Sequence, residues 1–155
     1  MPVSIGVASL AQAETLVEVP DEVRELLDGF PEGSLTVILR AHETLDPRLG
    51  GDSVAIRVVA HPRAKRLLEA TGPLTATSAN RSGEAPASDC GEAARLLSAN
   101  GDAIECVSGA CPGERPSTLI VWYSVCDSTE SRDIEVLREG VVSEREVRTW
   151  LKRMI

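Results

Sequence analysis

The sequence predicts an α/β fold in which helices flank a twisted, mixed β-sheet. Runs with the apolar, β-branched composition of strands alternate along the chain with segments whose apolar residues recur at the helical spacing. Capping pairs and glycines stand at the expected ends of the helical segments. The 155 residues suffice for a core without metal or disulfide support. No repeat or linker divides them, so we expect a single domain over residues 1–155.

The first half of the chain contains four expected strands and three expected helices. The strands are short apolar runs, at residues 2–8, 35–39, 54–58 and 74–77. One helix is expected to begin at Ser9, with Gln12 as its capping-box partner. The other two cover residues 21–28, ended by Gly29, and 62–70, ended by Gly72. Their helical spacing predicts two buried sets, Val23, Leu26 and Leu27 in one helix and Ala64, Leu67 and Leu68 in the other.

The second half adds two helices and three strands. Asp89 with Glu92 caps a helix that carries Ala93, Leu96 and Leu97 on its apolar side. The strands are expected at residues 103–107, 118–123 and 134–137. The last helix opens at Ser143, with Glu146 as capping partner, and its apolar residues are Val147, Trp150 and Leu151.

The composition weighs against several classes of function. A net charge of −8 repels phosphate backbones, which disfavours unaided nucleic-acid binding unless the arginines cluster. The four aromatic residues are too scattered for a base-stacking platform. No apolar run reaches the length of a membrane span, and no basic residue precedes the short N-terminal apolar stretch as in a signal peptide. We therefore expect a cytoplasmic protein without membrane contact.

The cysteines favour free thiols over a metal site. The four of them, Cys90, Cys106, Cys111 and Cys126, form no Cys-x-x-Cys pair, and both histidines lie far from them in sequence. Free thiols are the ordinary state of cysteines in a reducing cytoplasm. We expect no metal-ligating residues.

A run of small polar residues follows the strand expected at 74–77. Thr77, Ser78 and Asn80 place two hydroxyls and an amide at the strand exit, and Gly83 permits a sharp bend. Small polar side chains let backbone N–H groups approach an anion and add donors of their own, as a phosphate or ribose site requires. A solvent-exposed loop rich in turn-forming residues has the same composition.

Four motifs in the same order and spacing resemble the YrdC-like family, the threonylcarbamoyl-AMP synthases. "PLTATSANRSG" is similar to the family's Ser-x-Asn signature, and "VAIRVVAHP" to its arginine-bearing strand. "RPSTLIV" resembles its Ser-Thr strand, and "VLREGVVS" its Leu-Arg-Glu-Gly turn. The resemblance implies a YrdC-like fold and a nucleotidyltransferase that joins threonine, bicarbonate and ATP into threonylcarbamoyl-AMP and pyrophosphate, with Mg²⁺. The product would pass to a transferase that modifies transfer RNA.

The resemblance also assigns roles to individual positions. Ser78 and Asn80, with Thr77 beside them, would bind the nucleotide. Arg57 would grip the threonine carboxylate through its two-pronged guanidinium. Ser117 would contact the same substrate, and Arg138 would act near the phosphates. Arg57 and Arg138 are therefore the candidate catalytic residues, although an ordinary ion pair would equally explain Arg138.

One part of the family pattern has no match in this sequence. The family carries about fifty further N-terminal residues, within the usual size of such domains, that include a Lys-x-Arg pair holding ATP. No Lys-x-Arg occurs in the 155 residues. We expect this chain alone to be weakly active or inactive, and uncovered sheet surface to promote self-association. The alternative is a non-catalytic module that binds a nucleotide, or transfer or double-stranded RNA.

Overall fold

The computed structural model describes residues 3–80, 83–85, 87–98, 103–108, 115–123 and 134–154. The chain divides into two compact units. The first unit comprises Met1–Ala76 and Pro116–Ile155, and the second comprises Thr77–Arg115. Within the described residues, no helix is long and apolar enough to span a bilayer.

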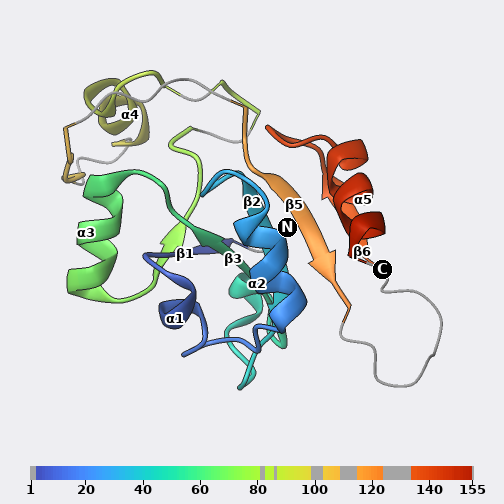
Figure 1. The fold of residues 1–155 in the computed structure, drawn as a ribbon. Coiled ribbons are helices and arrows are strands. Elements are labelled where there is room, and N and C mark those ends of the chain that lie inside the picture. Colours follow the sequence, from blue (N-terminus) through green and yellow to red (C-terminus); the bar gives the residue numbers. More distant parts are fainter. Residues whose placement is uncertain are drawn as a thin grey trace. The chain divides into compact units, whose positions relative to one another are not determined.

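The first unit is built on a six-stranded mixed sheet (Figure 1). Its strands are β1 (Ser4–Val7), β2 (Leu35–Arg40), β3 (Ser53–Val58), β4 (Leu74–Ala76), β5 (Thr118–Trp122) and β6 (Ile134–Arg138). They lie in the order β4-β1-β3-β2-β5-β6. The pairs β1–β3 and β2–β5 are parallel, and the other three pairs are antiparallel. The predicted α/β class and mixed sheet are confirmed.

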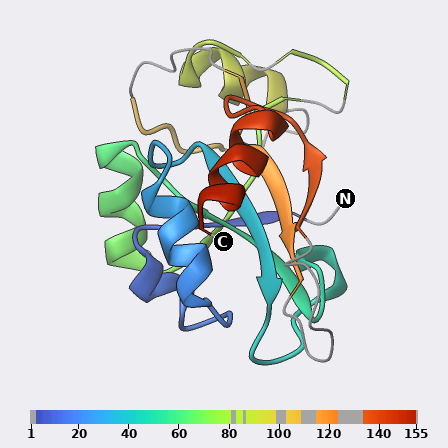
Figure 2. The same cartoon turned by 45° about the vertical axis from the view of Figure 1, so that its right-hand side comes forward.

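Three helices cover one face of this sheet. These are α1 (Leu10–Ala13), α2 (Asp21–Asp28) and α5 (Glu144–Arg153). Figure 2 shows α2 and α5 on the same side of β2 and β5. Their buried residues Ala13, Val23, Leu26 and Val147 join alternate residues of the strands in one hydrophobic core. The helical periodicity therefore identified the buried faces of α2 and α5.

The ends of α5 and α2 meet at an aromatic contact. Ser143 and Glu146 form the predicted capping box at the start of α5. One turn further along, the Trp150 ring lies 6.4 Å from the Phe30 ring, centroid to centroid. A Cβ at Gly29, just after α2, would lie 2.3 Å from Trp150 Nε1. The absence of a side chain at Gly29 is thus what lets α5 approach α2.

Gln12 has a different role from the capping partner that the sequence predicts. The Ser9 hydroxyl accepts from the Gln12 N–H at 3.2 Å, as in a cap. The Gln12 side chain, however, accepts from the Ala8 N–H at 2.8 Å and donates to the Leu68 carbonyl at 2.8 Å. Leu68 belongs to α3 (Pro62–Thr71), so this amide ties the end of β1 to a helix more than fifty residues away.

The second unit contains one described helix, α4 (Cys90–Leu97), which begins with the predicted Asp89 cap on the Glu92 N–H. The prediction of a strand at residues 103–107 is wrong. Residues 103–108 have no regular secondary structure, and their side chains are exposed. An apolar run becomes a strand only where a neighbouring strand pairs with it, and the described residues provide none here.

Three leucines expected in the core are exposed. Leu67 is 44% exposed, and Leu96 and Leu97 are 36% and 37% exposed. In α3 the contact with the sheet is made by Leu68, whose Cδ1 lies 3.7 Å from the Cβ position of Gly6. Successive helix residues are about 100° apart, since a turn takes about 3.6 residues, so Leu67 points away from that contact. In α4 only Ala93 is buried.

Candidate functional site

Three polar or charged residues, Thr36, Arg57 and Arg138, lie in one transverse row on the sheet face opposite α1, α2 and α5. Gly6 of β1 pairs with Arg57 of β3. The β2–β3 register sets Val37 opposite Ile56, which brings Thr36 beside Arg57. Thr36 in turn is beside Leu119 of β5, and Leu119 is opposite Arg138 of β6. We call the sheet face with Thr36, Arg57, Leu119 and Arg138 the arginine face.

A β-bulge brings Arg138 onto this face. Ile120 pairs with Val136 but Leu119 pairs with Arg138, so Leu137 is the extra residue of the bulge. Without it, strict alternation would place Arg138 on the same side as Ile134 and Val136, which belong to or pack against the core. The guanidinium instead donates from Nη2 to the Ser117 carbonyl at 3.0 Å.

Arg57 is half-buried and fixed by the loop before β2. Its Nε donates to the Gly33 carbonyl at 2.9 Å. Gly33 has a φ of +78°, which favours glycine, and a Cβ there would lie 3.2 Å from the Ala60 Cβ. Burial and, secondarily, the positive charge of Arg138 lower the pKa of Arg57. Arginine remains a cation even so, so the arginine face holds two neighbouring positive charges.

Neither arginine is neutralised within the described part of the chain. The ion pairs found there join other residues, and none involves Arg57 or Arg138. A buried charge without a partner is costly, and a second charge of the same sign nearby adds to the cost. An anion bound between the two guanidiniums would relieve both penalties. The geometry therefore suits a carboxylate or phosphate ligand.

Two buried hydroxyls lie beside the arginines. Ser117 is 4% exposed and Thr36 is 3% exposed, and their Oγ atoms are 2.7 Å apart. Ser117 also accepts from Arg138 through its carbonyl, so one residue contacts both the β2 hydroxyl and the β6 guanidinium. Ser34, 6% exposed and two residues before Thr36, has a buried Oγ without a hydrogen-bond partner among the described residues.

The Thr118 side chain holds the turn that follows Arg138. Thr118 is fully buried, and its Oγ1 accepts from the N–H groups of Gly140 and Val142 at 2.9 and 3.2 Å. The same hydroxyl donates to the Val142 carbonyl. A Cβ at Gly140 would lie 2.0 Å from the Pro116 carbonyl oxygen, so only glycine lets this turn close against the start of β5.

The structure brings together three of the predicted site residues, Arg57, Ser117 and Arg138. Thr77, Ser78 and Asn80 belong to the second unit. There, Thr77 and Ser78 are exposed, and the Asn80 amide donates to the Glu84 carbonyl at 2.8 Å. Gly83 within that turn has a φ of +86°, as the predicted bend requires. The nucleotide-binding role of these three residues stays a prediction.

Sequence reasoning missed Thr36 and Thr118. Thr36 is the only hydroxyl in the apolar run Leu35–Leu39, and a single polar residue within a buried strand requires a partner. The sequence alone therefore indicated that Thr36 has a polar partner. Thr118 lies in the Ser-Thr motif, but the resemblance assigned no role to it.

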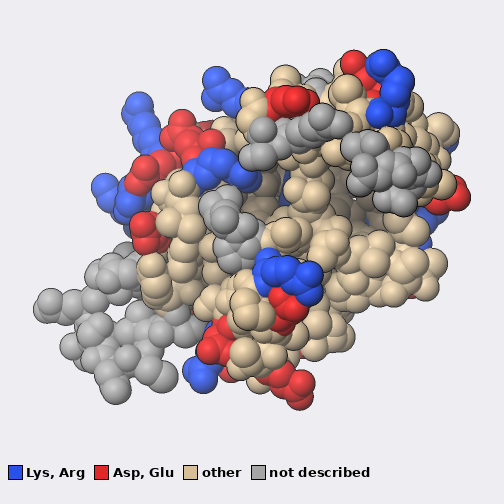
Figure 3. Space-filling view, turned by 180° about the vertical axis from the view of Figure 1, so that it is seen from behind, with Lys and Arg blue, Asp and Glu red and all other residues tan. Residues whose placement is uncertain are grey.

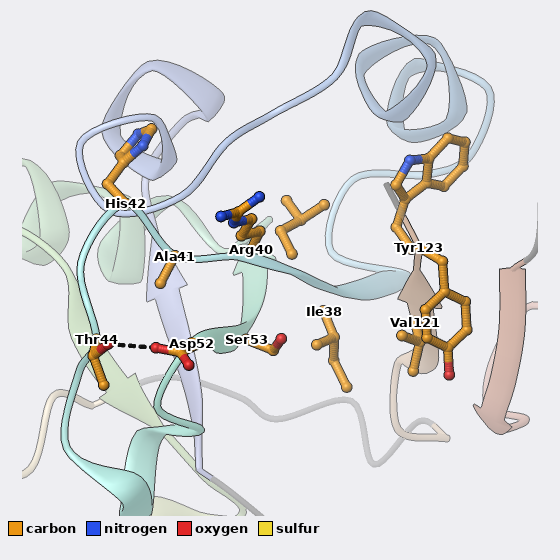
Figure 4. Close-up of a pocket in the computed structure, with 11 residues that line it drawn as sticks. Ile38, Arg40, Ala41, His42, Thr44, Asp52, Ser53, Val121 and Tyr123 are labelled. Atoms are coloured by element: carbon orange, nitrogen blue, oxygen red, sulfur yellow. Dashed lines mark hydrogen bonds between the residues drawn. The ribbon is translucent and has the colours of Figure 1, made fainter. Parts of the chain in front are cut away.

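A pocket of about 590 Å³ lies elsewhere on the first unit (Figure 4). It is lined by the carboxyl ends of β2 and β5, with Arg40, His42 and Tyr123, whereas Thr36 and Ser117 stand at the amino ends of these strands. Thr44 donates to Asp52 in its wall. None of the predicted site residues lines this pocket, and the two cations that suit an anion lie away from it.

Comparison with known proteins decides the family. Residues 1–140 match the Sua5/YciO/YrdC family model, described as "Telomere recombination". The chain belongs to this family. It is 34% identical to a Mycobacterium tuberculosis protein over 146 residues, which are 92% of this chain and 64% of the relative. It is 37% identical to the threonylcarbamoyl-AMP synthase of Halorhodospira halophila over 120 residues, 74% of this chain and 61% of that protein.

A solved structure shares the fold. P. abyssi Sua5, in a crystal structure with L-threonine, superposes with a TM-score of 0.76 at 32% identity. The match covers 96% of this chain and 42% of that one. The chain thus spans less than two thirds of the length of these relatives. The predicted YrdC-like membership is confirmed, and with it a relationship to the proteins of threonylcarbamoyladenosine synthesis.

Proposed function

We propose that this protein takes part in making threonylcarbamoyl-AMP from threonine, bicarbonate and ATP, with release of pyrophosphate. The observation that carries the proposal is the pair Arg57 and Arg138, two cations on one sheet face without a carboxylate partner among the described residues. The names of the relatives and the threonine complex of P. abyssi Sua5 support it.

In the proposed reaction, the amine of threonine combines with bicarbonate, water is lost, and an oxygen of the resulting carbamate attacks the α-phosphorus of ATP. Pyrophosphate leaves. Arg57 would bind the threonine carboxylate in a bidentate contact, held in position by its bond to the Gly33 carbonyl. Ser117 would contact the same substrate. Arg138 would stabilise the negative charge that develops on the phosphoryl oxygens.

The nucleotide would be bound by Thr77, Ser78 and Asn80 at the turn that Gly83 forms. Their hydroxyls and amide can donate to phosphate and ribose oxygens.

Mg²⁺ stays a prediction from the family. The described residues contain no group of three His, Cys, Asp or Glu side chains that could hold a metal, and the arginine face itself carries cations. The residues of the arginine face therefore do not fit a bound metal ion, and we assign no step of the reaction to a metal. Mg²⁺ commonly binds through substrate phosphates, with few protein ligands.

The proposed product would pass to a transferase that modifies transfer RNA, so we also propose a cytoplasmic location. Direct binding of RNA is the weaker alternative. In Figure 3, acidic side chains are interspersed with the lysines and arginines over the described surface seen in that view. Such mixed charge does not form the basic patch that phosphate backbones require.

The test is pyrophosphate release from ATP, measured with and without threonine and bicarbonate. It should be run on the 155-residue chain, for which we expect little turnover, and on a version extended by the codons immediately upstream in frame. Release that requires both co-substrates and is lost in Arg57→Ala supports the proposal. Arg48→Ala is the matched control, because Arg48 is exposed and paired with Asp46.

Three outcomes would favour another function over the synthase proposal. Threonine-independent release by the extended version would indicate a simple ATPase. Binding of ATP without any release would leave a non-catalytic nucleotide-binding module, and RNA binding that falls steeply with salt would identify an RNA-binding one. Concentration-dependent size-exclusion chromatography tests the predicted self-association.

A further inference from the structure

Two cysteines of the second unit contact each other across sixteen positions of sequence. The Cys106 Sγ donates to the Cys90 carbonyl at 3.2 Å. Cys90 is the first residue of α4, and Cys106 lies in the irregular segment 103–108. Both are free thiols.

We propose that Cys90 and Cys106 form a reversible disulfide. A disulfide requires Cα atoms within about 7 Å and sulfurs that can turn toward each other. The Cys106 sulfur already lies 3.2 Å from the backbone carbonyl oxygen of Cys90, so rotation of the Cys90 side chain toward it would bring the two sulfurs together. The bond would link the start of α4 to segment 103–108. This inference does not depend on the proposed synthase function.

Both sulfurs are within reach of a small oxidant. Cys106 is exposed, and Cys90 is partly exposed. Desolvation, and then the hydrogen bond with Cys90, raise the pKa of Cys106. A raised pKa reduces the thiolate fraction at neutral pH and slows reaction of an isolated thiol. Proximity, rather than unusual reactivity, is therefore what favours a bond between Cys90 and Cys106.

The oxidant that we propose is a peroxide. The thiolate of one cysteine attacks a peroxide oxygen, the O–O bond breaks, and a sulfenic acid and water form when the peroxide is hydrogen peroxide. The thiolate of the second cysteine attacks the sulfenic sulfur, the S–S bond forms, and a second water leaves. Overall, two thiols lose two electrons and two protons, and one hydrogen peroxide is reduced to two waters. A thiol reductant reverses the step by exchange.

The test compares three double variants of the full chain, each with two cysteines left. Cys111→Ser with Cys126→Ser retains Cys90 and Cys106. Cys90→Ser with Cys126→Ser retains Cys106 and Cys111, and Cys106→Ser with Cys126→Ser retains Cys90 and Cys111. Each reduced protein receives one equivalent of hydrogen peroxide, and free thiols are counted over time.

The first variant should lose both thiols at least about tenfold faster than the other two, because the Cys106 sulfur is held against Cys90. Trypsin should then release one cross-linked product joining peptide 82–95 to peptide 96–132, which separate on reduction. Equal rates in the three variants, or a product made only of intermolecular dimers, would overturn the proposal. Matching circular dichroism of the three reduced variants excludes a folding difference as the cause.

Discussion

Replacing Thr118 by valine tests the hydroxyl that holds the turn after Arg138. Valine has nearly the same shape but lacks Oγ1, so the substitution removes the two bonds accepted from Gly140 and Val142 and the one donated to the Val142 carbonyl. A hydrogen bond contributes about 1 kcal/mol net, so the loss should destabilise the fold by about 3 kcal/mol. For a chain of this size that lowers Tm by about 6–12 °C.

The matched control is Thr118→Ser, which keeps the oxygen and loses one methyl group, at a cost of about 1 kcal/mol. Thermal unfolding followed by circular dichroism, checked for reversibility, measures both variants. If Thr118→Val unfolds at the same temperature as Thr118→Ser, the hydroxyl does not hold the turn.

Two further predictions concern α5 and its neighbours. Gly29→Ala should destabilise the fold by about 1–3 kcal/mol and change tryptophan fluorescence, because the new methyl group would displace Trp150. Gly91→Ala is the control, because a Cβ there meets only a side-chain oxygen, at 3.3 Å, and this substitution should not destabilise the fold. Hydrogen bonds from the side chain and backbone of Ser143 lower the pKa of Glu146. A carboxyl group whose pKa is lower in the folded state stabilises the fold at pH values above its unfolded-state pKa. This stabilisation is lost as the pH falls through the folded-state pKa. The stability difference between wild type and Glu146→Gln, from urea titrations, should therefore be present at neutral pH and shrink below about pH 4; a constant difference would contradict it.

The elements that the sequence predicted correctly are those set by local signals. The Ser143–Glu146 capping box begins α5 as predicted, and Val23 and Leu26 are fully buried as their spacing indicates. Leu67, Leu96 and Leu97 had the same kind of signal and are exposed. Periodicity reports an apolar stripe, whereas burial depends on whether another element covers it.

The candidate site was only partly predictable for a related reason. Arg57 stood out as a charged residue within a β-run, and the motif resemblance pointed to Ser117 and Arg138. That Arg138 shares a face with Arg57 depends on the bulge at Leu119 and Ile120, since alternation alone would have placed it on the core face. A register shift arises from the pairing of two strands and leaves no local mark in either of them.

Threonine binding measured by calorimetry tests the central claim, that the arginine face binds a carboxylate. We predict that the chain binds threonine and that Arg57→Ala weakens this binding roughly tenfold to hundredfold, the usual value of a charge-assisted bond, with no change in Arg48→Ala. Threoninol, which lacks the carboxylate, should bind as weakly to wild type as threonine binds to Arg57→Ala. Equal affinity of wild type and Arg57→Ala for threonine would show that Arg57 does not bind the carboxylate.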